Sequence, residues 1–314
     1  MVILTVTMNP AYDMTYRVER FERGRAHRVY AVEQRIGGKG VNVTRVLNQL
    51  GTYARATGFS DHAFAAAAEL EMPVDFVHAL PWVRRTVVVS ECEDGTATSL
   101  QEPGARVTDP HASEQLAVRV AGLLPDIAGL VISGPLPGGI DPALPAEIAR
   151  TAIGDNVPTI CDIEGEALRL AARVPDVVLM PSQAELQRLT SARPDTIEAV
   201  VAAAAPLVER GVRAVITAPG LDGMAVVTAE GMWSATLAEP VAGASTGAED
   251  AAVAAVIAAL STTSSPDWPA VLGDAVATAA AAVVVPVAGE IDRGLRARLA
   301  PTVRLARLDL SKSP

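Results

Sequence analysis

Short apolar strands alternate with helical segments through the second half of the chain, and this alternation constrains the fold more than any other feature. Five apolar runs have the length of buried strands: 129–133, 159–162, 177–180, 214–217 and 224–228. Five other segments have the spacing of helices: 111–124, 142–153, 165–172, 182–189 and 196–210. This pattern predicts an α/β fold with a mostly parallel, doubly wound sheet. Such sheets carry their ligand sites at the carboxyl ends of the strands.

The first third of the chain is less regular. Residues 2–8 have the character of a buried strand that ends at Asn9-Pro10, and residues 41–50 have helical spacing. Two charged regions, 12–34 and 84–103, show the irregular alternation of short, half-exposed strands. We therefore expect these two regions to lie outside the core.

Charge and composition exclude several classes of protein. The formal net charge is −10, and no dense block of Lys or Arg is present, so binding to nucleic acid or to a membrane is not expected. The most apolar stretch, 275–287, is shorter than a membrane span and contains Pro286. Cys92 and Cys161 lie far apart, which argues against a disulfide framework or a zinc site. We expect a cytoplasmic protein.

The loop before the Ala-rich helix 251–260 is the first candidate site. It has the sequence Gly-Ala-Ser-Thr-Gly-Ala-Glu-Asp over residues 243–250. Free main-chain amides at a helix start favour an anion, and phosphoryl transfer needs such donors together with a base for the nucleophile. Asp250 is the candidate base. A plainer interpretation stays open, in which Glu249 and Asp250 only favour the helix dipole as first-turn acids.

Two further motifs precede helices or end strands. Residues 37–42, Gly-Gly-Lys-Gly-Val-Asn, combine a backbone that a ligand can approach closely with the charge of Lys39 and the amide of Asn42. Residues 9–13, Asn-Pro-Ala-Tyr-Asp, place polar groups including Asp13 at the end of the first strand. Each motif taken alone is equally compatible with an ordinary turn.

In this order, the segments resemble the ribokinase-like (PfkB) carbohydrate kinases, most closely the branch with 1-phosphofructokinase and tagatose-6-phosphate kinase. The matching segments span nearly the whole chain: 7–16, 37–45, 85–86, 94–96, 102–104, 133–139, 162–168, 220–223 and 243–250. The ordered set is far more specific than any one motif.

The resemblance implies a three-layer α/β/α core with a mostly parallel sheet and a small discontinuous β lid. The core would comprise residues 1–10, 38–83 and 105–314, and the lid residues 11–37 and 84–104. In this family the lid often also forms a dimer surface, so the resemblance implies a homodimer through the lid.

The resemblance also implies an ATP- and Mg²⁺-dependent kinase that transfers the γ-phosphate to a hydroxyl of a phosphorylated ketohexose, such as fructose 1-phosphate or tagatose 6-phosphate. Asp250 would be the general base, in an anion hole with Gly247, Ala248 and Glu249. The sugar phosphate would be bound by Asp13, Gly38, Lys39, Asn42, Arg85 and Ser133, with Lys39 and Arg85 on its existing phosphate. The nucleotide would be bound by Ser182, Glu185, Thr217, Gly220 and Gly223, with Glu185 toward the metal.

The chain departs from the family pattern over residues 58–63, which lack the usual paired glycines, and at three single positions. Glu249 replaces the glycine of the usual Gly-Ala-Gly-Asp motif, Ser182 replaces an asparagine, and Val87 stands where asparagine often follows Arg-Thr. A second hypothesis therefore stays open: a catalytically impaired relative that binds a sugar phosphate or nucleotide in a regulatory role. A kinase for an unphosphorylated sugar or nucleoside is the third hypothesis, and the pair Lys39 and Arg85 argues against it.

Overall fold

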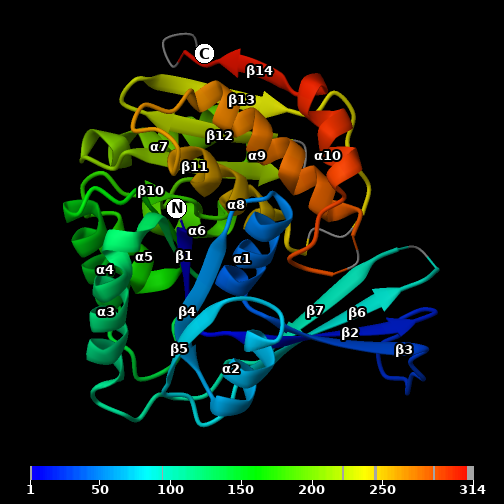
Figure 1. The fold of residues 1–314 in the computed structure, drawn as a ribbon. Coiled ribbons are helices and arrows are strands. Elements are labelled where there is room, and N and C mark those ends of the chain that lie inside the picture. The colour runs from blue at the N-terminus through cyan, green and yellow to red at the C-terminus, as the bar shows by residue number, and fades with distance from the viewer. Residues whose placement is uncertain (1, 94, 221–222, 244–245, 286, 310–314) are drawn as a thin grey trace.

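The computed structural model of the 314-residue chain describes residues 2–93, 95–220, 223–243, 246–285 and 287–309. Three of the motifs above therefore lie partly outside the described residues, at 94, 221–222 and 244–245. The described residues form two sheets of very different size, and the smaller one projects from the larger body (Figure 1).

The large sheet is the centre of the molecule. Its order is β14-β13-β12-β11-β10-β9-β8-β1-β4-β5. The strands are β1 (Val2–Thr7), β4 (Ala54–Ser60), β5 (Val74–His78), β8 (Ile127–Ser133), β9 (Thr159–Asp162), β10 (Val178–Leu179), β11 (Ala214–Gly220), β12 (Gly223–Thr228), β13 (Gly231–Thr236) and β14 (Arg304–Arg307). Neighbouring strands are parallel from β11 to β5, and β12, β13 and β14 continue the sheet antiparallel. The carboxyl ends of seven adjacent strands therefore meet at one edge.

Helices cover both faces of this sheet. One face carries α1 (Lys39–Gln49), α8 (Ala248–Leu260) and α9 (Trp268–Val283), with α10 (Arg293–Leu299) against α9. The other carries α2 (His62–Glu69), α3 (Ala112–Leu123), α4 (Leu144–Gly154), α5 (Gly165–Ala171), α6 (Gln183–Thr190) and α7 (Ile197–Glu209).

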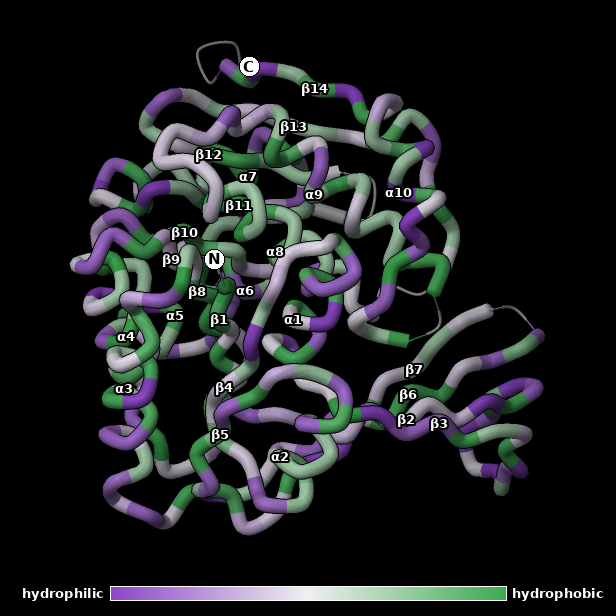
Figure 2. The backbone as a smooth tube through the Cα atoms, viewed as in Figure 1, coloured by the Kyte–Doolittle hydropathy of each residue, from purple (hydrophilic) through white to green (hydrophobic). Residues whose placement is uncertain are grey.

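Successive strand residues pack into opposite cores, because side chains alternate across a strand. Ile3 belongs to the core under α1, α8 and α9, whereas Leu4 belongs to the core under the other helices. This double burial explains why the central strands are continuously apolar. Figure 2 shows the same distribution: hydrophobic segments follow the central strands, and hydrophilic segments lie on the outer helices and the tip of the small sheet. The described residues thus form a three-layer α/β/α architecture with a mostly parallel sheet, as the resemblance implies.

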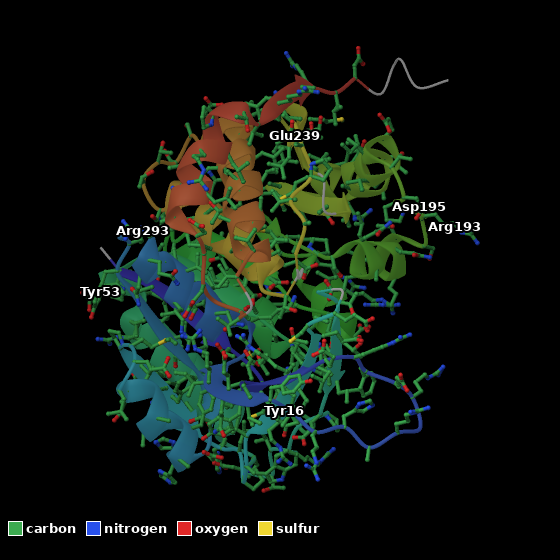
Figure 3. All side chains as sticks on the ribbon, turned by 90° about the vertical axis from the view of Figure 1, so that its right-hand side faces the viewer. Tyr16, Tyr53, Arg193, Asp195, Glu239 and Arg293 are labelled. Carbon is green, nitrogen blue, oxygen red and sulfur yellow. The ribbon has the colours of Figure 1, made fainter. Side chains whose placement is uncertain are left out.

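The small sheet has the order β3-β2-β6-β7. Its strands are β2 (Ala11–Val18), β3 (Ala31–Gly37), β6 (Arg84–Glu91) and β7 (Ala97–Gln101), so all four fall within the two segments that the sequence assigns to a lid. The base of the sheet is attached to the core where the Tyr12 ring meets the edge of Phe64 in α2, with ring centroids 5.3 Å apart. Figure 3 shows Tyr16 on this sheet, apart from Glu239 on the core.

The predicted elements agree with the structure to within a few residues, and the exceptions have clear causes. Residues 54–78 form β4, α2 and β5, which the sequence did not predict because α2 is a short Ala-rich helix without strong periodicity. The antiparallel edge strands β13 and β14 were also missed, and β14 is exposed along its length. The apolar stretch 275–287 lies mostly in α9, which ends at Val283. Among the described residues, no helix is long and apolar enough to cross a membrane.

Candidate active site

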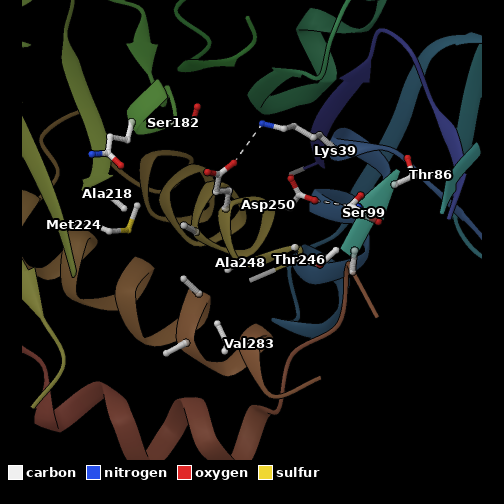
Figure 4. A pocket seen from close by; sticks show the side chains of 18 of the residues that line it. Lys39, Thr86, Ser99, Ser182, Ala218, Met224, Thr246, Ala248, Asp250 and Val283 are labelled. Atoms are coloured by element: carbon white, nitrogen blue, oxygen red, sulfur yellow. Dashed lines mark hydrogen bonds and ion pairs between the residues drawn. The ribbon is translucent and has the colours of Figure 1, made fainter. Parts of the chain in front are cut away.

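A cavity of about 620 Å³ lies where the small sheet meets the carboxyl edge of the large sheet and the starts of α1 and α8. Figure 4 shows Thr86 and Ser99 of the small sheet at one end of this cavity and Ala218 and Met224 at the other. Asp250 lies between the two ends. The cavity therefore extends to both sides of Asp250, so that two ligands could meet at this carboxylate.

The start of α8 offers main-chain donors to the cavity. Gly247 precedes the helix with a left-handed φ of 82°, and a Cβ at this position would lie 2.9 Å from the Cα of Ala288. No described side chain caps this N-terminus, whereas Ser182 caps α6 and Asp267 caps α9. The first amides of α8 are therefore available to an anionic ligand.

Asp250 lies in the first turn of α8 and is 5% exposed. Its Oδ2 accepts a hydrogen bond of 3.0 Å from Nδ2 of Asn42. Burial raises the pKa of Asp250 to about 7; Lys39 and Asn42 oppose this rise, while Asp162 and Glu249 add to it. A carboxylate that titrates near neutral pH is suited to act as a general base.

Lys39, the first residue of α1, supplies positive charge beside Asp250. Its Nζ donates to Oδ1 of Asp162 at 2.8 Å and lies 3.6 Å from Oε2 of Glu249. Burial opposes the charge of Lys39, but its pKa is nevertheless raised because nearby carboxylates outweigh burial; these are Asp162, Asp250, Glu249 and Glu185. Lys39 is therefore a permanent cation in the middle of the cavity.

Asp13 of β2 supplies a second, partly buried carboxylate at the small-sheet end. Burial raises its pKa to about 6, although the guanidinium groups of Arg45, Arg84 and Arg35 and a hydrogen bond with Asn42 lower it. Asn42 therefore interacts with both Asp13 and Asp250. An ionised Asp13 is a hydrogen-bond acceptor suited to ligand hydroxyls.

Arg84, rather than Arg85, faces the cavity. Side chains alternate along β6, so Arg84 and Thr86 line the cavity and Arg85 points to the other side of the small sheet. Arg84 is 8% exposed, and its Nε and Nη1 donate to the main-chain oxygens of Asn9 and Glu102 at 3.4 and 3.1 Å. Arg85 is largely exposed and pairs with the Glu102 carboxylate at 3.1 Å. The structure thus does not bring Arg85 to the predicted phosphate site.

A family model for the pfkB family of carbohydrate kinases matches residues 6–292. The chain belongs to this family. It is therefore a phosphotransferase of the carbohydrate-kinase class, and its cavity, with the start of α8 and a buried carboxylate, is the candidate active site of a pfkB-family kinase.

Two relatives are similar along much of this pfkB-family chain. A 1-phosphofructokinase of Xanthomonas campestris pv. campestris is 29% identical over 266 residues, which cover 82% of this chain and 83% of that protein. A tagatose-6-phosphate kinase of Staphylococcus epidermidis is 30% identical over 195 residues, which cover 60% of this chain and 62% of that protein.

Solved structures show the same architecture. Phosphofructokinase-2 of Escherichia coli, in complex with potassium, is 26% identical with a TM-score of 0.85, covering 95% of this chain and 98% of that one. A possible 1-phosphofructokinase of Thermotoga maritima is 22% identical with a TM-score of 0.88, covering 98% of this chain and all of that one, and supports the fold alone.

The predicted nucleotide-side residues of this pfkB-family kinase are only partly brought together. Ser182 and Gly223 line the cavity, and Gly220 pairs with Gly223 across β11 and β12. Thr217 is buried and donates from Oγ1 to the main-chain oxygen of Pro181 at 2.6 Å. Its hydroxyl therefore holds the backbone beside Ser182.

Glu185 and Ser133 have structural positions that the sequence did not reveal. The Glu185 carboxylate accepts from the main-chain amide of Ser182 at 2.8 Å and completes the capping box of α6. Ser133 ends β8, is fully buried and does not line the cavity. Neither residue presents a side chain to the cavity in the way its predicted role requires.

Several cavity residues were not predicted from the sequence. They are Arg84, Thr86, Ser99 and Gln101 at the small-sheet end and the apolar residues Val276, Ala279, Ala280 and Val283 of α9. Asp162 pairs with Lys39 without lining the cavity, and the sequence did not reveal this contact either. Strand alternation in β6 groups Arg84 with Thr86 and separates both from Arg85, but it does not say which face meets the cavity. The small apolar residues gave no signal, because in sequence they only indicate a buried helix.

Proposed function

We propose that the protein is an ATP-dependent sugar-phosphate kinase that transfers the γ-phosphate to a hydroxyl of a phosphorylated ketohexose, such as fructose 1-phosphate or tagatose 6-phosphate. The observation that carries this proposal is the position of Asp250, a buried carboxylate with a pKa raised to about 7 in the first turn of α8, where no described side chain caps the helix. The names of the two relatives support the substrate class.

The acceptor is proposed to lie at the small-sheet end. Asp13 and Asn42 are positioned to hold its hydroxyls, with the Gly38 backbone close by. Arg84 uses Nε and Nη1 on main-chain oxygens, which leaves Nη2 as its nitrogen for the acceptor's existing phosphate. This assignment replaces the one made for Arg85 from the sequence.

The nucleotide is proposed to lie at the opposite end, with its γ-phosphate toward the first amides of α8. The wall there is apolar and made of small side chains, as a flat base requires; it includes Val276, Ala279, Ala280 and Val283. Lys39 lies next to Glu249 and Asp162 rather than among the small-sheet residues, so we assign it to the transferred phosphate instead of the acceptor's own phosphate.

A magnesium ion is proposed to accompany the nucleotide. The described residues contain no group of three or more His, Cys, Asp and Glu side chains placed to hold a metal on their own. This fits Mg²⁺, which binds through substrate phosphates, water and one or two carboxylates. Asp162 is the candidate protein ligand: its Oδ1 pairs with Lys39, and its buried Oδ2 has no hydrogen-bond partner among the described residues. When bound, Mg²⁺ would neutralise phosphate charge.

The chain's own groups then account for the transfer. Asp250 accepts the proton of the attacking hydroxyl as its oxygen forms a bond to the γ-phosphorus, and the bond between that phosphorus and the β–γ bridging oxygen breaks to release ADP. The α8 amides and Lys39 balance charge on the phosphoryl oxygens. The small sheet excludes water from this exchange.

A homodimer through the small sheet is also proposed. The sheet face opposite the cavity is apolar; its cross-strand neighbours include Met14, Tyr16, Val32, Val87 and Leu100. Val32 is 51% exposed and Leu100 57% exposed. Apolar strands that are exposed in this way are typical of an interface.

The alternative of an impaired, regulatory relative is kept because Glu249 brings a carboxylate within 3.6 Å of Lys39, at the place assigned to the transferred phosphate. One panel separates the hypotheses: ADP release coupled to each of fructose 1-phosphate, tagatose 6-phosphate and free fructose, with product identified by ³¹P NMR. We expect a phosphorylated ketohexose to give at least a hundredfold higher kcat/KM than free fructose. Binding without ADP release would favour the regulatory alternative, and preference for free sugars would contradict the proposal.

A further inference from the structure

Glu249 is an unusual group to find at this helix start. It lies in the first turn of α8, one residue before Asp250, and it lines the cavity. Its carboxylate turns toward Lys39 and lies 3.6 Å from the ammonium nitrogen. Glu249 therefore brings its negative charge to the cation that the transferred phosphate needs.

The two carboxylates that contact Lys39 differ in their freedom to leave it. The Asp162 side chain is 2% exposed and makes the closer contact of 2.8 Å. The Glu249 side chain is 61% exposed, and no other ion pair in the described part of the chain holds it. Glu249 can therefore swing into solvent at little cost, whereas Asp162 cannot.

We propose that Glu249 is an internal competitor for the transferred phosphate, which occupies Lys39 in the free enzyme and must be displaced before a nucleoside triphosphate can bind. This inference rests on the proposed function, because it needs a phosphate at Lys39. Glu249 thus sets the affinity for the donor. It is a positioning residue for Lys39 and takes no part in the transfer.

The competition predicts discrimination between the triphosphate and the diphosphate. Only the γ-phosphate reaches the position that the Glu249 carboxylate contests, so ADP binds without displacing it. When the triphosphate is bound, the displaced carboxylate remains near the phosphate oxygens and repels them. Because the carboxylate is partly exposed, solvent screens this repulsion and the effect is moderate.

The test is isothermal titration calorimetry with the whole protein, Mg²⁺, and either ADP or the non-hydrolysable β,γ-imido analogue of ATP. The variant Glu249→Gln keeps the size of the side chain and removes its charge. Glu166→Gln is the matched control, since Glu166 is also a first-turn glutamate, 52% exposed and paired with an arginine at 3.4 Å, but lies outside this cavity.

We expect Glu249→Gln to bind the triphosphate analogue about tenfold more tightly and ADP less than threefold more tightly, with no change for Glu166→Gln. An unchanged ratio between the two affinities, or weaker triphosphate binding, would overturn the competition while leaving the nucleotide site intact. If the unmodified protein binds neither nucleotide, the proposed function fails as well. The ratio distinguishes this role from a merely structural one, because a general loosening of α8 would weaken both nucleotides.

Discussion

Asp13 and Asp250 are two carboxylates that both interact with Asn42, but the charges around them have opposite sign. Asp13 lies on the small sheet, and the charges that act on it come from Arg45, Arg84 and Arg35. Asp250 lies at the start of a core helix, and besides Lys39 the charges that act on it come from other carboxylates.

The difference shows how two aspartates in one cavity can have different functions. Burial raises both pKa values, to about 6 for Asp13 and about 7 for Asp250. Cations around Asp13 favour its charged form, which suits a fixed acceptor for hydroxyls. Carboxylates around Asp250 disfavour its charged form, which suits a group that takes up a proton.

Replacing Asp250 is expected to have the largest effect on activity. We expect Asp250→Asn to lower kcat by about a thousandfold or more, since the base is removed while the shape of the side chain is kept. The acceptor and nucleotide affinities should change less than about threefold. Steady-state kinetics with calorimetry check both. Near-normal turnover would show that Asp250 is only a first-turn acid.

Replacing Asp13 is expected to affect the KM of the sugar phosphate rather than kcat. Asp13→Asn should raise the KM of the sugar phosphate by about a hundredfold, because a charge-assisted hydrogen bond to a hydroxyl is lost, and should lower kcat by less than tenfold. The contrast with Asp250→Asn is the informative part. A loss confined to kcat would mean that Asp13 belongs to the chemistry of transfer.

The two adjacent arginines, Arg84 and Arg85, test where the acceptor's own phosphate binds. Arg84→Gln is expected to raise the KM of a phosphorylated acceptor about thirtyfold, because a buried cation on the acceptor phosphate is lost. Arg85→Gln, the matched control on the opposite sheet face, should change that KM less than twofold. Equal effects would place the phosphate elsewhere. The KM of a free sugar should be the same for both variants as for the unmodified protein.

The smallest of these expected effects is the change of kcat/KM with pH. Asp250 must be ionised to act, so kcat/KM should fall about tenfold between pH 8 and pH 6 as a group with a pKa of about 7 takes up its proton. The sign for stability is opposite. Because the pKa is higher in the folded than in the unfolded chain, the contribution of Asp250 to stability is largest in acid and is lost as the pH rises from about 4 to 7. Chemical denaturation of wild type and Asp250→Asn over this range measures the difference.

The sequence predicts the fold well because strand and helix periodicity are local properties. The apolar runs that became β8 and β9 and the helical spacing of α3 and α7 are visible without tertiary information. Residues 54–78 escaped prediction because the short Ala-rich α2 lacks strong periodicity and because β4 and β5 are held by pairing with β1 and with each other.

The candidate site was predicted where a motif fixes the backbone, and missed where the partner is distant in sequence. Gly38 and Gly247 indicate the starts of the two helices that carry Lys39 and Asp250. The Lys39–Asp162 contact joins residues 123 positions apart, and no local pattern reveals it. The choice between neighbouring arginines depended on which face of β6 points to the cavity, which only the pairing of the small sheet decides.

A crystal structure with Mg²⁺, the non-hydrolysable ATP analogue and fructose 1-phosphate tests the central claim most directly. We predict the γ-phosphate at the first amides of α8, the acceptor's own phosphate at Arg84, and an acceptor hydroxyl within about 3 Å of an Asp250 carboxylate oxygen. A sugar phosphate bound in the reverse orientation, or one with no hydroxyl in reach of Asp250, would contradict the account.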